Sequence, residues 1–450
     1  QADKNVNGVV KDATGAPLPG VSVLVKGTNR GTVTDLDGKF ALSVPEGSSL
    51  IFSFIGFSSQ TVIVQDQNLI DVIMQEDSQS LDEVVVVGYG TMKKSDLTGA
   101  VSSVRGEKLM DRSQANAVKS LQGRVAGVEV LNTQNAPGAG ARIRIRGINS
   151  ISSGVQPLFV IDGIIGGDLN MINPGDIESM EVLKDASSAA IYGARGANGV
   201  IMVTTKRGKK KQSQIIYDNL FSVSTLASSV PGLNSTEFME IYNRAFDNAA
   251  KYDPSGFAQG RYKRADPANY PNLFDSSGKP LYNTNWEDEI YNTAFGQNHN
   301  LAFRGGSTNT AYNVSLGYTN EDGIMMGSGF ERFNGKISVD SDVKKWLTIG
   351  GSLLATRSSR KIVDDGNGGL NVPRMVAEAL PIIPVKYPNG KWGANSDWPG
   401  TEGAENPVNI AQNRGTTAFV TQLYSDVYLN FKISPELEFK TTFSTILESN

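Results

Sequence analysis

The second half of the chain is marked by a strict alternation of apolar and polar residues. Between residues 212 and 450, seven runs place apolar side chains at every second position, which is the period of a β-strand with two different faces. In SQIIYDNLFSVST, for example, Ile215, Tyr217 and Val223 share one face. The other runs are centred on Leu301, Leu316, Ile337, Ile349, Leu429 and Phe439. We therefore expect seven antiparallel strands in this region.

The segments between these runs alternate in length. Long or medium connectors, at about 227–296, 320–331 and 359–416, alternate with the short segments RGGSTNT, SDVKK and SPE. Long loops at one end and tight turns at the other are typical of an outer-membrane β-barrel. The mean hydropathy of −0.24 does not exclude such a barrel, because alternating strands average apolar with polar residues.

The first long connector also carries a helix signal. Asn234 and Glu237 have the spacing of a capping box. Six apolar residues then recur on one helical face: Phe238, Ile241, Tyr242, Ala245, Phe246 and Ala249. We expect a helix that packs against its own loop.

Residues 1–76 predict a small β-sandwich, since about seven short strands with turn signals leave no room for a helix. Val21, Val23 and Val25 share one strand face, for example, as do Phe52 and Phe54. A polar linker begins the next segment, residues 77–94, which contains the run DEVVVVGYG. Its four valines predict either a buried central strand or an extended segment held for pairing with a partner strand.

Residues 95–211 mix helix and strand signals. VKSLQGRVAG (118–127) predicts a short helix that ends at glycine, and ASSAAIYG (186–193) a second short helix. Strands are expected in ARIRIRGI, PLFVIDGII, SMEVLKD and GVIMVTTKRG. The basic run that follows, from Lys206 to Lys211, predicts a solvated junction between domains.

Composition removes several functional classes. The 450 residues include no cysteine and one histidine, which excludes disulfides, thiolate metal sites and multi-histidine metal sites. The formal net charge of −4 gives no sign of nucleic-acid binding. The glycine-rich segments PGAGAR and GARGANG lack the residues of a phosphate-binding loop. We expect no enzyme active site, no metal and no cofactor.

Two sets of side chains are candidates for binding. Arg142, Arg144 and Arg146 form a row on one strand face, and we expect them to pair with acidic groups inside a barrel lumen. Four aromatic residues of the long connectors are candidates for cargo binding, although loop packing explains them equally well: Trp286, Tyr387, Trp392 and Trp398.

Several long motifs resemble those of the SusC-like branch of TonB-dependent outer-membrane transporters. GVVKDATGAPLPGVSVLVKGT and TDLDGKFAL resemble its carboxypeptidase-regulatory-like N-terminal domain, and DEVVVVGYG its TonB box. LQGRVAGVEV, IRIRG, PLFVIDG and IESMEVLKDASSAAIYGARGANGVIMVTTKRG resemble its plug. The resemblance covers the whole chain and favours a coupling role for the valine run. It assigns the box to Asp82, Glu83, Val84, Val85, Val86, Val87, Gly88 and Tyr89.

The resemblance implies a mainly β fold in four parts: an N-terminal sandwich (1–76), a linker with the TonB box (77–94), a mixed α/β plug (95–211) and an antiparallel transmembrane barrel (212–450). The family's barrel has 22 strands, whereas about seven are expected here. An open sheet of seven strands would expose unpaired edges to lipid. We therefore expect the chain to be the N-terminal part of a longer protein.

The resemblance also implies a function and partners. It implies energy-coupled import of glycans across the outer membrane of a Gram-negative, Bacteroides-like bacterium, with the N-terminal domain in the periplasm and membrane lipids around the barrel. The implied protein partners are a SusD-like surface lipoprotein and TonB of the TonB–ExbB–ExbD complex, and a dimer of SusC–SusD-like pairs fits the same picture. Peptide import, or signalling through the N-terminal domain, remains the alternative.

Overall fold

The computed structural model divides the chain into two compact units, residues 1–85 with 91–96, and residues 86–90 with 97–450. It describes residues 3–449 except 27, 29, 46, 55–56, 58, 65–68, 75–83, 88–89, 94–100, 111–115, 133–134, 148–153, 230–231, 263, 364–370 and 400–404. Of residues 84–87 and 90–93 it describes the backbone alone. Each unit has a hydrophobic core of its own.

The first unit contains the predicted small sandwich. Its strands form two sheets, in the orders β4-β1-β7 and β3-β2-β5-β6. Their bounds are β1 (Asp3–Lys11), β2 (Ser22–Val25), β3 (Gly31–Val33), β4 (Lys39–Pro45), β5 (Ser49–Ser53), β6 (Gln60–Ile63) and β7 (Val72–Ile73). Alternate residues of both sheets fill one core, in which the rings of Phe40 and Phe52 meet edge to face at 5.4 Å. The period-two pattern of valines and phenylalanines therefore predicted the inner faces correctly.

The valine run forms β8 (Val84–Val87), which makes a two-stranded sheet with β9 (Gly90–Lys93). The strand is therefore paired locally.

The plug region is built on a five-stranded mixed sheet in the order β10-β15-β16-β13-β14, beside a hairpin of β11 and β12. Its strands are β10 (Val101–Arg105), β11 (Val128–Leu131), β12 (Arg142–Ile145), β13 (Leu158–Ile161), β14 (Ile164–Ile165), β15 (Ile177–Leu183) and β16 (Val200–Thr205). Its short helices are α1 (Gly106–Met110), η2 (Lys119–Leu121), η3 (Leu169–Met171), η4 (Pro174–Asp176), α2 (Ala186–Ala189) and η5 (Ala190–Gly196). β13 and β16 are nearly continuous apolar sequences because both of their faces are covered, whereas β15 also carries Glu178, Ser179 and Glu181.

Two local predictions in this region need correction. PLFVIDGII is not one strand, because Asp162 and Gly163 have positive φ angles of 48° and 88° and turn the chain back into β14. Two consecutive positive φ angles are the geometry of a tight hairpin turn, for which Asp-Gly is a favoured pair. The helix expected over residues 118–127 is only the single turn η2.

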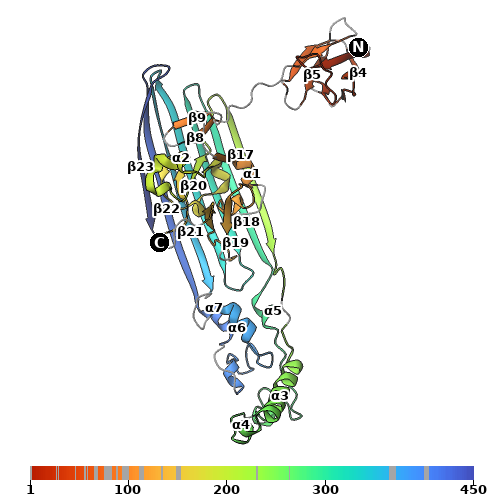
Figure 1. The fold of residues 1–450 in the computed structure, drawn as a ribbon, viewed down its shortest axis with the longest axis vertical. Coiled ribbons are helices and arrows are strands. Elements are labelled where there is room, and N and C mark those ends of the chain that lie inside the picture. The colour runs from red at the N-terminus through yellow and green to blue at the C-terminus, as the bar shows by residue number, and fades with distance from the viewer. Residues whose placement is uncertain are drawn as a thin grey trace. The chain divides into compact units, whose positions relative to one another are not determined.

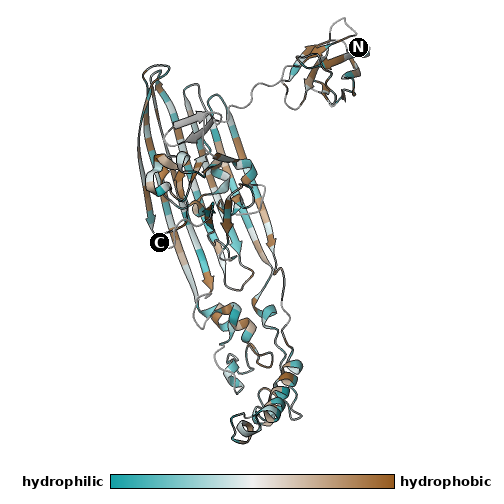
Figure 2. Cartoon of the chain, viewed as in Figure 1, coloured by the Kyte–Doolittle hydropathy of each residue, from teal (hydrophilic) through white to brown (hydrophobic). Residues whose placement is uncertain are grey.

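The region from residue 213 onward forms one antiparallel sheet of seven strands in chain order, as predicted. The strands are β17 (Ser213–Ser224), β18 (Ala294–Gly306), β19 (Thr310–Asp322), β20 (Gly329–Lys344), β21 (Leu347–Val363), β22 (Gly415–Lys432) and β23 (Glu438–Ser449). Teal and brown bands alternate along these strands (Figure 2). Leu316 and Ile337 are about half exposed on the outward face, whereas Ser315 and Lys336 beside them are buried against the plug. The sheet is thus polar toward the plug and apolar on the other face.

The connectors are sorted by length, also as predicted. Residues 307–309, 345–346 and 433–437 join the strands at one end, and residues 225–293, 323–328 and 364–414 join them at the other. The helices of the long connectors lie beyond this second end (Figure 1). They are α3 (Ser235–Tyr252), α4 (Pro254–Ala258), η6 (Pro267–Asn269), α5 (Trp286–Ile290), α6 (Val372–Glu378), η7 (Asn395–Asp397) and α7 (Pro407–Asn413).

Helix α3 begins with the capping box expected from its sequence. The Asn234 side chain accepts the Glu237 N–H at 2.9 Å, and the Glu237 carboxylate accepts the Asn234 N–H at 3.0 Å. Phe238 and Tyr242 pack against the core of the long connectors, whereas Ile241 is 50% exposed. None of the helices in the described ranges is long and apolar enough to cross a membrane.

Candidate functional site: the contact between plug and barrel strands

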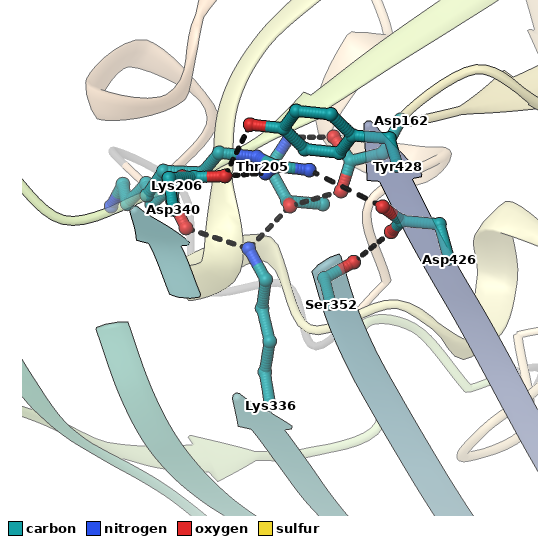
Figure 3. Close-up of polar contacts among 9 residues, drawn as sticks. Asp162, Thr205, Lys206, Lys336, Asp340, Ser352, Asp426 and Tyr428 are labelled. Atoms are coloured by element: carbon teal, nitrogen blue, oxygen red, sulfur yellow. Dashed lines mark hydrogen bonds and ion pairs between the residues drawn. The ribbon is translucent and has the colours of Figure 1, made fainter. Parts of the chain in front are cut away.

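The last strand of the plug leads directly to the inner face of the sheet. β16 ends at Thr205, and the chain passes through Lys206 and Arg207 before β17 begins at Ser213. The Thr205 hydroxyl, the Lys206 carbonyl and the Arg207 side chain meet polar residues of β20 and β22 (Figure 3). The covalent link between plug and sheet therefore lies within their polar contact.

Thr205 joins the two parts through its hydroxyl group. The Asp162 carboxylate, at the β13–β14 turn, accepts the Thr205 N–H at 2.9 Å and also the Thr205 hydroxyl. The Thr205 hydroxyl oxygen in turn accepts a hydrogen bond from the Lys336 ammonium group, which also donates to the Lys206 carbonyl at 2.6 Å. Lys336 is 1% exposed, so its charge depends on these protein partners rather than on water.

Arg207 reaches two carboxylates of the sheet. Its Nη1 lies 2.7 Å from Asp340 Oδ1 on β20, and its Nη2 lies 3.8 Å from Asp426 Oδ2 on β22. The Tyr428 hydroxyl donates to the same Asp340 oxygen at 2.6 Å, and Ser352 donates to Asp426. Burial opposes the charge of Arg207, but the nearby carboxylates outweigh it and raise the pKa of the guanidinium above its ordinary value.

The charged residues described above are equal in number for the two signs. The cations of Lys206, Arg207 and Lys336 are matched in number by the carboxylates Asp162, Asp340 and Asp426. Hydrogen bonds of this kind exchange with water at a net cost of only about 0.5–1.5 kcal/mol each, rising to about 1.5–3 kcal/mol where a charge is involved. The plug is therefore held by several moderate interactions that water can replace.

Similar polar contacts continue toward the end of the sheet that carries the long connectors. Asn173 donates to Asn300 at 3.2 Å, and the Asp168 N–H donates to the Tyr424 hydroxyl at 2.9 Å. Buried Arg332 donates to the Asn170 carbonyl at 3.3 Å. Among the described residues, the sheet contributes two buried members to the plug core, Leu354 and Tyr424, so polar contacts outnumber apolar ones between plug and sheet.

Two residues of the predicted arginine row, Arg142 and Arg144, lie on β12 within the plug, and Arg146 follows the end of that strand. Arg142 and Arg146 are exposed, and Arg146 has a positive φ of 55°. Arg144 Nη1 lies 4.0 Å from Glu129 Oε2 on the neighbouring strand β11. Pairing of this row with barrel strands stays a prediction.

The four aromatic candidates divide into two groups. Trp398 is fully buried and Trp286 is 4% exposed, and Trp286 Nε1 donates to the Leu380 carbonyl at 2.9 Å. Both rings belong to the core of the long connectors. Tyr387 and Trp392 are only partly buried, and the Lys386 ammonium group lies 4.0 Å from the centre of the Trp392 ring. Burial supports loop packing for the first pair and leaves the second pair accessible to a ligand.

The predicted TonB box is described only in part. Val84, Val85, Val86 and Val87 form β8, whereas Asp82, Glu83, Gly88 and Tyr89 lie outside the described residues. Its coupling role stays a prediction.

Sequence reasoning missed most residues of the plug contact. The basic run was expected to be solvated, but Arg207 pairs with Asp340, and Lys210 pairs with Asp342. A signal was present, because Lys336, Asp340 and Asp426 occupy the polar positions of alternating strands. The two acids at those positions, Asp340 and Asp426, could have been proposed as partners of the basic run from Lys206 to Lys211. Across the described ranges, no cluster of three or more histidine and acidic side chains could hold a metal ion.

Two family models match the chain. Residues 6–86 match the CarboxypepD_reg-like domain, and residues 93–200 match the TonB-dependent receptor plug domain. A plug domain that rests on the polar face of antiparallel strands, with long connectors at one end, defines the class of plugged outer-membrane β-barrels.

Relatives and solved structures give the family. The chain is 37% identical to TonB-dependent receptor P3 of Formosa agariphila over 98% of this chain and 42% of that protein. It is 35% identical to TonB-dependent receptor SusC of Bacteroides thetaiotaomicron over 90% of this chain and 40% of that protein. The RagAB peptide importer in its open-open state is 25% identical, with a TM-score of 0.65, over 81% of this chain and 42% of that chain.

The chain belongs to the SusC-like TonB-dependent receptors of the Gram-negative outer membrane. It spans about two fifths of the length of the relatives named here. It contains the N-terminal domain, the plug and the seven-stranded sheet from β17 to β23.

Proposed function

We propose that the protein containing this chain imports glycans across the outer membrane by a TonB-dependent, energy-coupled mechanism. The observation that carries the proposal is the polar contact of Thr205, Arg207 and Lys336 between plug and sheet. A contact that water can replace allows the plug to leave the wall under force and to return afterwards. Family membership supports the same function.

The coupling handle in this proposal is the segment 82–89. Its strand β8 pairs with β9 within the chain, and a two-stranded sheet leaves a further edge available for an added strand. TonB would pair with this segment from the periplasm and transmit force to the plug. The N-terminal domain would lie on that same side.

The partners and cargo follow from the family resemblance. A SusD-like surface lipoprotein would cover the end with the long connectors and deliver cargo, and two such pairs would form a dimer. Glycans are the proposed cargo class. Peptides are the second candidate, because the solved structures of RagAB are described as those of a peptide importer.

The test replaces Val85 and Val87 with proline in the complete transporter. Proline removes the N–H donors needed for strand pairing, so we expect energised uptake to fall to the level of cells without TonB. Cargo binding at the cell surface should be unchanged, because the plug and connectors are not altered.

The matched control is Val85→Thr with Val87→Thr, which keeps the donors and the β propensity and should retain most of the uptake. Normal import by the double proline variant would contradict the proposed coupling role of β8.

A further inference from the structure

We infer that two connectors of the barrel together form a binding site for a neutral oligosaccharide; this inference rests on the proposed import function. A short hairpin is closed by the bridge between Phe274 and Pro280 in the first long connector. A similar hairpin is closed between Lys386 and Trp392 in the other long connector. Residues of both hairpins line one cavity of about 520 Å³, within the usual range for small-ligand sites.

The floor of this cavity is held in place before any ligand arrives. Trp398 is fully buried beneath it, with the rings of Tyr270 and Phe274 at 5.0 and 5.1 Å. The Leu281 N–H donates to the Leu273 carbonyl at 2.8 Å, which fixes the first hairpin. The Tyr387 N–H donates to the Lys391 carbonyl at 2.8 Å, which fixes the second. A preformed site loses little conformational entropy on binding.

Two tyrosine rings make an aromatic corner. Tyr282 comes from one connector and Tyr387 from the other, with ring centres 6.1 Å apart and planes at 80°. Neither side chain is fully buried, and Leu281 beside them is 50% exposed. Tyrosine offers an apolar ring and a polar hydroxyl together. This combination suits a sugar, which presents a C–H face and hydroxyl groups at its rim.

The charged groups of the cavity neutralise one another. Asp397 accepts hydrogen bonds from the Lys391 ammonium group at 3.1 Å and from the Tyr387 hydroxyl at 3.0 Å. A tyrosine hydroxyl is protonated at physiological pH, and burial together with this bond to Asp397 raises the pKa of Tyr387 further above its ordinary value. Lys391 and Asp397 are the charged members of the lining, and their charges cancel.

Amide groups complete the rim. Asn269 and Asn272 are exposed at one side and Asn389 at the other. An amide side chain both donates and accepts hydrogen bonds, as sugar hydroxyl groups do. Among the described residues that line it, the cavity offers no excess charge to a peptide terminus or to a uronic acid. The lining therefore favours a neutral oligosaccharide.

The experiment measures binding to the complete transporter in detergent by calorimetry. The probes are hexasaccharides of glucose, mannose, galactose and xylose, a hexauronate, and a capped neutral hexapeptide. At least one neutral hexasaccharide should bind, and Tyr282→Ala should weaken its binding by about tenfold or more. Asn272→Ala, an exposed change that leaves the fold intact, should weaken it by about threefold. The matched control Tyr252→Ala removes a 74% exposed ring of α3, outside the cavity, and should have no effect.

Unchanged tryptophan fluorescence in each variant will show that the surroundings of the tryptophans, Trp398 among them, are preserved. If no neutral hexasaccharide binds the unaltered transporter, or if the hexauronate or the peptide binds more tightly, the proposal is overturned. It is also overturned if both cavity variants bind as the unaltered protein does. Uptake is scored separately in cells. If the two cavity variants bind the hexasaccharide as the unaltered protein does and import glycans normally, this site is rejected and the import function stands.

Discussion

At the scale of single residues, Asp340 is a shared acceptor at the contact between plug and sheet. One oxygen of its carboxylate accepts from Arg207 at 2.7 Å and from Tyr428 at 2.6 Å. The Arg207 side chain is only 28% exposed, so its charge is poorly solvated when that acceptor is weakened. The carboxylate therefore holds the end of the plug against β20.

We expect Asp340→Asn to weaken plug docking by about 1–3 kcal/mol, because the charge-assisted bond becomes a neutral one. Cells that carry the variant should admit more vancomycin, and the purified transporter should unfold at a lower temperature. Asp322→Asn, an exposed change at the far end of β19, serves as the control. Equal antibiotic sensitivity in the two variants would remove Asp340 from the docking contact.

Gly138 provides a second prediction at this scale. Its φ is +63°, and a Cβ atom there would lie 2.0 Å from the Phe330 ring on β20. Gly123 has a φ of +73° but open space around it. Both changes to alanine cost about 1 kcal/mol in backbone strain. Gly138→Ala should cost about 1–3 kcal/mol more through overpacking. Thermal unfolding of the two variants measures the difference, and equal melting temperatures would contradict it.

At the scale of elements, the capping box of α3 is a contribution that can be measured separately. Asn234→Ala removes the acceptor for the Glu237 N–H and should destabilise the start of α3 by about 1 kcal/mol. Amide hydrogen exchange over residues 235–252 should become about fivefold faster. Asn248→Ala, an exposed change within the same helix, should leave exchange unchanged or slower. The same rate in both variants would show that the cap contributes nothing.

Elements with a strong period were predictable from sequence, because a sheet with one covered face imposes alternation. This held for the seven strands from β17 to β23 and for the sandwich. Contacts between elements were harder to predict, since hydropathy does not say which polar position meets which. Thus Lys336 and Arg207 were not recognised as partners of the plug contact. The turn at Asp162 had a local signal, the Asp-Gly pair, which the apolar residues around it obscured.

At the scale of the whole molecule, the two compact units have separate cores. Phe52 is fully buried in the sandwich, so Phe52→Ala should destabilise that domain by about 3–5 kcal/mol. Calorimetry of the complete protein should show one transition shifted to lower temperature and the plug and barrel transitions unchanged. Leu36→Ala, at an 88% exposed position, is the control. A common shift of all transitions would show that the units unfold as one.

The aromatic corner of Tyr282 and Tyr387 has a consequence for how new preferences can arise in such proteins. Its two halves lie more than a hundred positions apart in the chain and belong to different connectors. Recombination that exchanges one connector between relatives would pair a Tyr282 side of the corner with a Tyr387 side from another protein. The two sides would not have been selected together to bind one cargo. A new cargo preference therefore arises when both connectors are exchanged together. It can also arise when one connector changes residue by residue while its contacts with the other connector are kept. Covariation between the two hairpins among relatives should record that constraint.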